Sequence, residues 1–387
     1  MKIARLEAFP VNIAYTRVEK SALIARAGVS DVVVKLTTDD GLVGWGEACM
    51  NSETTGILAA VEAARPFLIG RNPWEGEAIA RDYFIRGGWQ FQATTGNFAF
   101  AGIDMALWDL CGKAAGQPIH RLLGGPLRDR VDYFCYLQWG DEADVTRQCE
   151  DALARGYRVF YMKAGVDPVA EEAMLRLVRA KVGPGARIRV DPNQAWNVAE
   201  AAQLITRWHA AFDLDFVEGP VPARPFDAML DLKARSPVPL CLNEGLWGVA
   251  EVTEAITRRA ADHLCFSTYW VGTVRRFMML AQLAAQHGIS ICKHTHGEFG
   301  LAAALGQHLC LAIPNAGIGH QQTAQMMAGD ILTEPLPIAD GPSWGVIEAP
   351  GLGVTVDEDR LEAAHAAYRR DGAFMPYGTA GQSLPPL

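Results

Sequence analysis

The sequence predicts an α/β protein in which a small N-terminal α+β domain precedes a (β/α) barrel. From residue 131 onward, short apolar runs alternate with helical stretches rich in Ala and Leu. The residues that close these runs are Gln138, Lys163, Asp191, Glu218, Glu244, Ser267 and His294, and successive positions differ by 25, 28, 27, 26, 23 and 27. One strand, one helix and two short loops fit each step, and this alternation implies parallel strands with right-handed crossovers.

The N-terminal part has a different pattern. Residues 31–48 predict two strands joined by a tight Asp-Asp-Gly turn. Residues 55–123 have helical spacing that ends near Gly116 and Pro118. We therefore expect an α+β domain over 1–125, a barrel over 126–350, and a segment over 351–387, with a helix at 358–370, that packs back on the first domain. A doubly wound open sheet is the alternative, but no Gly-rich phosphate loop follows the first strand.

Composition restricts the function. The 387 residues carry a formal charge of −9, which argues against nucleic acid or an anionic membrane as the main partner. The start of the chain has charges where a signal peptide would be apolar, and no run of eighteen apolar residues occurs, so we expect a cytoplasmic protein. The eight cysteines form no CxxC pair, which favours free buried thiols over disulfides or a zinc site.

Three carboxylates close successive runs: Asp191, Glu218 and Glu244. The C-terminal strand ends of a barrel form one rim, and neighbouring strands lie about 4.8 Å apart, so these side chains are expected to converge. Three carboxylates in a dry site repel one another strongly, and a hard divalent cation relieves that repulsion. The set predicts a Mg²⁺ site, although each acid could instead be a helix cap or an ion-pair partner.

Lys163 closes the run before Asp191, and alternation places Tyr161 on the same inward face. A lysine beside a metal and away from water is expected to have a lowered pKa and to serve as a general base. Tyr161 could donate a hydrogen bond or position the substrate. Asn193, two residues past Asp191, could hydrogen-bond a substrate carboxylate.

The run ISICKHTHGE predicts the opposite wall, with His294 and His296 on its inner face. His294 is the better placed acid or base, and Glu298, in the following loop, could orient a histidine. Both histidines could also be packed, hydrogen-bonded core residues.

Several motifs together resemble the mandelate racemase/muconate lactonizing enzyme branch of the enolase superfamily, over nearly the whole chain. They are AGIDMALWDLCGKAAGQPIHRLLGG, YMKAG, RVDPNQAW, FVEGP and CLNEG. The resemblance implies a modified TIM barrel, (β/α)7β, with an N-terminal α+β capping domain. It implies Mg²⁺ on Asp191, Glu218 and Glu244, with Lys163 taking the proton α to a substrate carboxylate and giving a metal-stabilised enediolate. It also implies a homo-oligomer.

This sequence departs from the branch at four places. Tyr161 replaces the first Lys of the usual Lys-x-Lys, and Gly219 replaces a polar residue after the second metal ligand. Ser267 stands on the sixth strand where a His-pairing Asp or a Lys is usual, and His320 stands on the eighth strand in place of a Glu. Ser267 and His320 are therefore candidate substrate-binding residues.

These features favour dehydration of a hydroxy (sugar) acid, with protonated His294 assisting departure of the hydroxyl. Racemisation, epimerisation or cycloisomerisation of a carboxylate are the alternatives, as is a non-catalytic member that keeps the metal site. A dinuclear metal hydrolase would need histidine ligands near the first barrel strand, and none occurs there. Specificity is expected from residues 15–30 and 51–55, where Arg17, Lys20 and Arg26 would suit an acidic or polyhydroxylated substrate.

Overall fold

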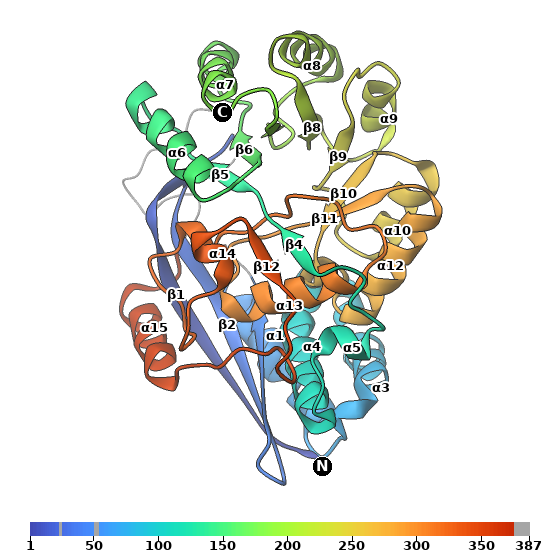
Figure 1. The fold of residues 1–387 in the computed structure, drawn as a ribbon. Coiled ribbons are helices and arrows are strands. Elements are labelled where there is room, and N and C mark those ends of the chain that lie inside the picture. Colours follow the sequence, from blue (N-terminus) through green and yellow to red (C-terminus); the bar gives the residue numbers. More distant parts are fainter. Residues whose placement is uncertain (23–24, 50–53, 375–387) are drawn as a thin grey trace.

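The computed structural model describes residues 1–22, 25–49 and 54–374. Its centre is a curled, parallel, seven-stranded sheet in which the strands follow one another in sequence order (Figure 1). The strands are β5 (Cys135–Leu137), β6 (Val159–Lys163), β7 (Arg187–Asp191), β8 (Leu214–Glu218), β9 (Leu240–Leu242), β10 (His263–Phe266) and β11 (Ser290–Lys293). This is the barrel that the alternating pattern predicts, and the doubly wound alternative is wrong.

The sheet closes through an irregular eighth segment. Ala316 bridges Ile291 of β11, and His320 bridges Tyr133 just before β5. The segment between these bridges therefore lies between the first and last strands of the sheet. This arrangement completes the predicted barrel, with an irregular segment in place of a regular eighth strand.

Helices follow the barrel strands and cover the outside of the sheet. They are α6 (Glu142–Ala154), α7 (Pro168–Val182), α8 (Val198–Phe212), α9 (Asp227–Lys233), α10 (Val249–Arg258), α11 (Thr268–Val271), α12 (Val274–Gln286) and α13 (Gly300–Ala312). The sequence defines their ends. In α8, Asn197 caps the first turn by accepting from the backbone N–H of Glu200, and Leu204, Ile205 and Trp208 form the buried face.

The N-terminal domain is an antiparallel sheet of β1 (Ile3–Lys20), β2 (Ala25–Thr38) and β3 (Val43–Ala48), with helices on one face. The helical elements are α1 (Thr54–Ala63), α2 (Arg65–Leu68), η1 (Pro73–Glu75), α3 (Gly76–Arg81), η2 (Asp82–Arg86), η3 (Trp89–Gln92), α4 (Ala93–Ala115) and α5 (Ile119–Leu122). Helix α4 packs so closely on β3 that a Cβ at Gly46 would lie 1.9 Å from the carbonyl oxygen of Gly102. Glycine at position 46 is therefore a requirement of this contact.

Two carboxylates of the N-terminal domain cap barrel helices. Glu47 of β3 accepts from the backbone N–H groups of Phe299 and Ala302 at the start of α13, at 2.6 and 3.0 Å. Asp104 of α4 accepts from the backbone N–H of Val274 at the start of α12, at 2.7 Å. These oxygens accept from backbone N–H groups that have no partner within their own helices, so the bonds fix the domain against the barrel.

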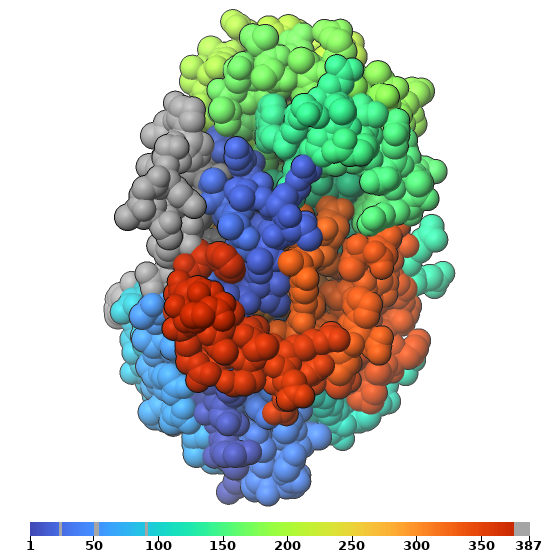
Figure 2. All heavy atoms as spheres, turned by 90° about the vertical axis from the view of Figure 1, so that its left-hand side faces the viewer, coloured from blue at the N-terminus to red at the C-terminus, as the bar shows by residue number. Residues whose placement is uncertain are grey.

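The last described part of the chain returns to the first domain. It contains η4 (Ala324–Met326), α14 (Pro337–Asp340), β12 (Ser343–Gly345), which pairs with β4 (Arg130–Asp132), and α15 (Glu358–Asp371). Helix α15 lies beside β1, where the His365 ring is 2.7 Å from the carbonyl oxygen of Pro10. Figure 2 shows this red segment directly against the blue N-terminal strands.

All eight cysteines are free and buried, as predicted. No helix within the described ranges is both long enough and apolar enough to cross a bilayer.

Candidate active site

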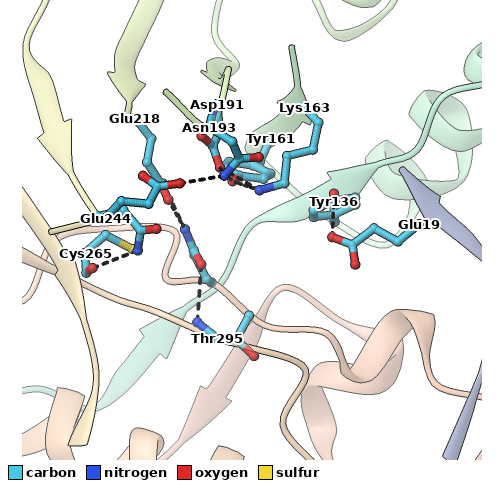
Figure 3. Close-up of polar contacts among 12 residues, drawn as sticks. Glu19, Tyr136, Tyr161, Lys163, Asp191, Asn193, Glu218, Glu244, Cys265 and Thr295 are labelled. Carbon is cyan, nitrogen blue, oxygen red and sulfur yellow. Dashed lines mark hydrogen bonds and ion pairs between the residues drawn. The ribbon is translucent and has the colours of Figure 1, made fainter. Parts of the chain in front are cut away.

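The three predicted metal ligands gather at one end of the barrel. Asp191 and Glu218 are the last residues of β7 and β8, and Glu244 lies two residues past β9. All three side chains are buried. Figure 3 shows them on neighbouring strands, together with Asn193, Tyr161 and Lys163. A Cβ built on Gly219 would lie 2.5 Å from Oε2 of Glu244 and 3.5 Å from Oδ1 of Asp191, so both oxygens border the space that the absent side chain leaves.

Asn193 connects two of the carboxylates. Its side-chain nitrogen lies 3.2 Å from Oδ2 of Asp191 and 2.9 Å from Oε1 of Glu244, and its backbone N–H donates to Oδ1 of Asp191 at 2.9 Å. The residue has a positive φ of 45°, which Asn tolerates better than most residues. The sequence assigned Asn193 to substrate, whereas the structure places its amide on the carboxylates.

Gln321 is a site residue that the sequence analysis missed. Its side-chain amide donates to both Oε1 and Oε2 of Glu218 at 2.8 Å, and its side-chain oxygen accepts from the backbone N–H of Thr295 at 3.2 Å. His320 does not take this place, because its Nδ1 accepts from the backbone N–H of Lys293 and its ring is buried. Strand alternation at a known register would have distinguished the two residues, but the irregular eighth segment hides that register.

Crowding of the carboxylates changes their protonation. Burial and the charge of Asp191 raise the pKa of Glu218 well above its usual value. The same causes raise the pKa of Glu244 to about 7. Oε2 of Glu244 and Oδ1 of Asn193 are buried without a hydrogen-bond partner in the described structure. Buried oxygens that lack donors, beside mutually repelling carboxylates, fit a hard divalent cation such as Mg²⁺.

Lys163 and Tyr161 both reach Asp191. Nζ of Lys163 lies 2.6 Å from Oδ2 of Asp191 and 3.1 Å from the Tyr161 hydroxyl, which itself donates to Oδ2. Burial lowers the Lys163 pKa, but the charges of Asp191, Glu19 and Glu218 outweigh burial and raise it. The expected lowering therefore does not arise from the protein groups alone.

The opposite wall holds both histidines on the predicted inner face. The His294 ring lies at an aromatic wall, with its centroid 4.8 Å from that of Trp270 and 5.1 Å from that of His296. Nδ1 of His294 is 2.5 Å from the hydroxyl of Tyr269. Ser267 is buried and is the N-cap residue of α11, two residues before Tyr269.

Glu298, which the sequence predicted could orient a histidine, pairs with a lysine in the structure. It forms a buried ion pair with Lys293, whose side chain lies against Gly306 of α13 on the outer face of the strand. The charge of Lys293 opposes the effect of burial on Glu298. This pair joins β11 to the loop that precedes α13.

The expected basic residues of the capping domain are partly neutralised. Arg26 is buried and pairs with Glu19 at 2.5 Å, and it donates to the backbone oxygen of His296 at 2.8 Å. Glu19 also accepts from the Tyr136 hydroxyl at 2.9 Å, as Figure 3 shows. Arg17 forms an exposed pair with Asp144. Residues 51–53 of the other expected specificity segment lie outside the described residues.

Thiols lie against one of the carboxylates. Ligand atoms of Glu218, Cys241 and Cys265 all lie within 4.8 Å of one another, and Cys241 and Cys265 cluster with Phe216 and Cys292 in the barrel core. Thiolates favour softer metals than Mg²⁺, so this set does not compete with the three carboxylates for Mg²⁺.

Comparisons with known proteins agree with this fold and site. Residues 4–124 match the model for the mandelate racemase/muconate lactonizing enzyme N-terminal domain, and residues 144–360 match the enolase C-terminal domain-like model. The chain belongs to the mandelate racemase/muconate lactonizing enzyme family of the enolase superfamily.

Individual relatives differ in their named reactions. A Streptomyces coelicolor protein named "Probable glucarate dehydratase" is 30% identical, with 89% of this chain and 86% of that protein covered. An N-succinyl-L-Arg/Lys racemase of Bacillus cereus is 26% identical, with 94% and 97% covered. A solved enolase from Thermobispora bispora, complexed with magnesium and formate, is similar at a TM-score of 0.87 and 26% identity, with 96% of this chain and 94% of that chain covered.

Proposed function

We propose that this protein abstracts the proton α to the carboxylate of a hydroxy (sugar) acid and eliminates water to give a keto acid. The observation that carries the proposal is the position of Lys163, whose Nζ lies 2.6 Å from a carboxylate of a three-acid set suited to Mg²⁺. A base beside such a set is the arrangement that α-proton abstraction requires.

Asp191, Glu218 and Glu244 would hold the cation, and Asn193 and Gln321 would orient their oxygens through the hydrogen bonds described above. Bound Mg²⁺ would supply positive charge against the negative charge that develops on the substrate carboxylate during proton removal. Lys163 takes the proton. The Tyr161 hydroxyl is hydrogen-bonded to both the Lys163 amine and Asp191, and so holds the amine beside the carboxylate.

Racemisation or epimerisation is the second candidate. Two histidines, His294 and His296, lie on the wall opposite Lys163 and would be placed to deliver a proton to the other face of the carbanion. The relative named as an N-succinyl-L-Arg/Lys racemase supports testing this candidate. A non-catalytic member that keeps the metal site is the third possibility.

The test is a screen of acid sugars, hydroxy acids and amino-acid derivatives with Mg²⁺ in D₂O, read by NMR. Lys163→Ala is the test variant, and Lys181→Ala, at an exposed lysine remote from the site, is the matched control. We expect α-hydrogen exchange and keto-acid formation in the wild type and in Lys181→Ala, and neither in Lys163→Ala. An epimer without a keto acid would favour racemisation. No exchange across the library, with Mg²⁺ bound, would favour the non-catalytic reading.

A further inference from the structure

The partner of His294 is a tyrosine. Tyr269 lies in the short helix α11 directly after β10, and its hydroxyl is 2.5 Å from Nδ1 of His294. Both side chains are buried. Among the described residues, Tyr269 is the hydrogen-bond partner of the His294 ring.

Neighbouring aromatic rings hold this pair in one orientation. Phe98 stacks on Tyr269 with ring centroids 5.1 Å apart, and Trp270 lies at 4.8 Å from the His294 ring. Well-packed aromatic side chains have few accessible rotamers, so the distance between the hydroxyl and Nδ1 is defined by the surrounding core.

We propose that Tyr269 is a positioning residue that holds His294 as a neutral imidazole with its proton on Nε2, so that His294 only donates a hydrogen bond to the substrate and does not act as a base. The inference rests on the proposed function for its catalytic consequence, but the state of the His294 ring can be measured without any substrate.

The direction of the hydrogen bond follows from the acidity of the two groups. Burial raises the pKa of Tyr269 well above its usual value, and the nearby Glu298, Cys49 and Cys265 act in the same direction, so the phenol keeps its proton. Burial lowers the pKa of His294 well below its usual value, and His296, Lys163, Lys293 and Arg26 lower it further. A phenol O–H is a stronger acid than the N–H of neutral imidazole, so the phenol donates to Nδ1 and the ring proton is on Nε2.

This tautomer decides between the candidate reactions. Nε2 that carries a proton has no lone pair in the ring plane, so it cannot remove a proton from the opposite face of a substrate. A neutral ring also lacks the readily released proton of an imidazolium, so the departing hydroxyl cannot take its proton from protonated His294 as the sequence predicted. Racemisation with His294 as the second base is therefore disfavoured.

In the resulting elimination, Lys163 carries out both proton transfers, on its own side of the substrate. Lys163, as the free amine, removes the α-proton, and the C–H electron pair is delocalised onto the substrate carboxylate. That pair then forms the C=C bond between the α- and β-carbons while the bond between the β-carbon and its hydroxyl oxygen breaks. The resulting Lys163 ammonium gives its proton to the departing oxygen, water leaves, and the enol product converts to the keto acid. Nε2–H of His294 donates a hydrogen bond throughout and transfers no proton.

The first readout is NMR of ¹⁵N-histidine-labelled protein, with the His294 signal assigned by its loss in His294→Gln. We expect the two-bond and three-bond couplings of a neutral ring protonated on Nε2. In Tyr269→Phe we expect loss of this single tautomer. Tyr83→Phe, which removes another buried hydroxyl in the capping domain, should leave the His294 signal unchanged. An imidazolium, or a ring protonated on Nδ1 in the wild type, would overturn the proposal.

The second readout is the reaction in D₂O with the substrate found in the screen. We expect recovered substrate to carry deuterium only with retained configuration, and Tyr269→Phe to lower kcat about 10- to 100-fold with KM little changed. Formation of the opposite epimer by the wild type but not by His294→Gln would overturn the assignment of His294 as a donor only. If no substrate exchanges, the proposed function fails, while the NMR result still decides the role of Tyr269.

Discussion

The side-chain amide of Gln321 lies 2.8 Å from both carboxylate oxygens of Glu218. It thereby fixes the plane of one predicted Mg²⁺ ligand from the segment that closes the barrel. Removing such a partner of a metal ligand commonly costs 10- to 100-fold in metal affinity. We predict that Gln321→Leu weakens Mg²⁺ binding by about this factor, measured by isothermal titration calorimetry.

The control for this prediction is the next residue. Gln322 donates to the backbone oxygen of Phe134 at 3.3 Å, and within the described structure no hydrogen bond joins its side chain to the three carboxylates. Gln322→Leu should therefore change Mg²⁺ affinity much less than Gln321→Leu. Equal affinities in Gln321→Leu and the wild type would show that Glu218 does not need this amide.

Gly219 is predicted to leave the space that the cation needs. An added Cβ would come within 2.5 Å of Oε2 of Glu244, and the residue has a positive φ of 48°. We predict that Gly219→Ala lowers Mg²⁺ affinity at least about 100-fold, because the methyl group displaces a ligand oxygen. Gly116→Ala separates this effect from backbone strain, since Gly116 has a φ of 62° with nothing within 4 Å of its Cβ position. Equal Mg²⁺ affinity in the two variants would contradict the prediction.

Tyr161 is predicted to serve turnover more than folding. Its hydroxyl joins Lys163 to Asp191. We expect Tyr161→Phe to lower kcat about 10- to 100-fold, with the melting temperature changed by only a few degrees. Tyr157→Phe, which removes a hydroxyl bonded to the carbonyl oxygen of Gly341, is the matched control and should retain kcat. A variant Tyr161→Phe with wild-type turnover would make Tyr161 a packing residue.

The sequence predicted the barrel because each strand–helix unit repeats a local pattern, and the repeat indicated the strand ends to within two residues. It also placed Tyr161 and Lys163 on one face, since a five-residue strand alternates regularly. Tyr269 and Gln321 were missed for a shared reason. Tyr269 lies on a single helical turn after its strand, and Gln321 lies in a segment held by isolated bridges. Neither position therefore belongs to a regular repeat from which the direction of its side chain could be predicted.

The neutralised Arg26 shows another limit of sequence reasoning. Its charge suggested an acidic substrate, but Glu19, on the facing strand of the same hairpin, forms an ion pair with it and neutralises that charge. Register in a long hairpin with a bulge between Ala14 and Glu19 cannot be read from composition. The identity of the substrate must therefore come from the screen.

Asp104 predicts a measurable dependence of stability on pH. Burial, with the backbone N–H of Val274 acting against it, raises the pKa of this carboxyl from 3.8 to about 7 in the folded protein. In the unfolded chain the carboxyl returns to its ordinary pKa, so between about pH 4 and pH 7 the folded state binds more protons. The contribution of Asp104 to the free energy of unfolding therefore falls as pH rises through this window and is constant above it. Three pKa units correspond to at most about 4 kcal/mol.

Asp104→Asn keeps an oxygen that can accept from the Val274 N–H but removes the titration. We expect urea unfolding at pH 4.5 and pH 7.5 to show a smaller loss of stability on raising the pH in the variant than in the wild type. The comparison of variant with wild type is needed because Glu47, with a pKa also raised to about 7, adds a similar dependence in both proteins. The same change in stability with pH in both proteins would mean that Asp104 is ionised at its helix cap, where the helix dipole and the Val274 N–H would then outweigh burial.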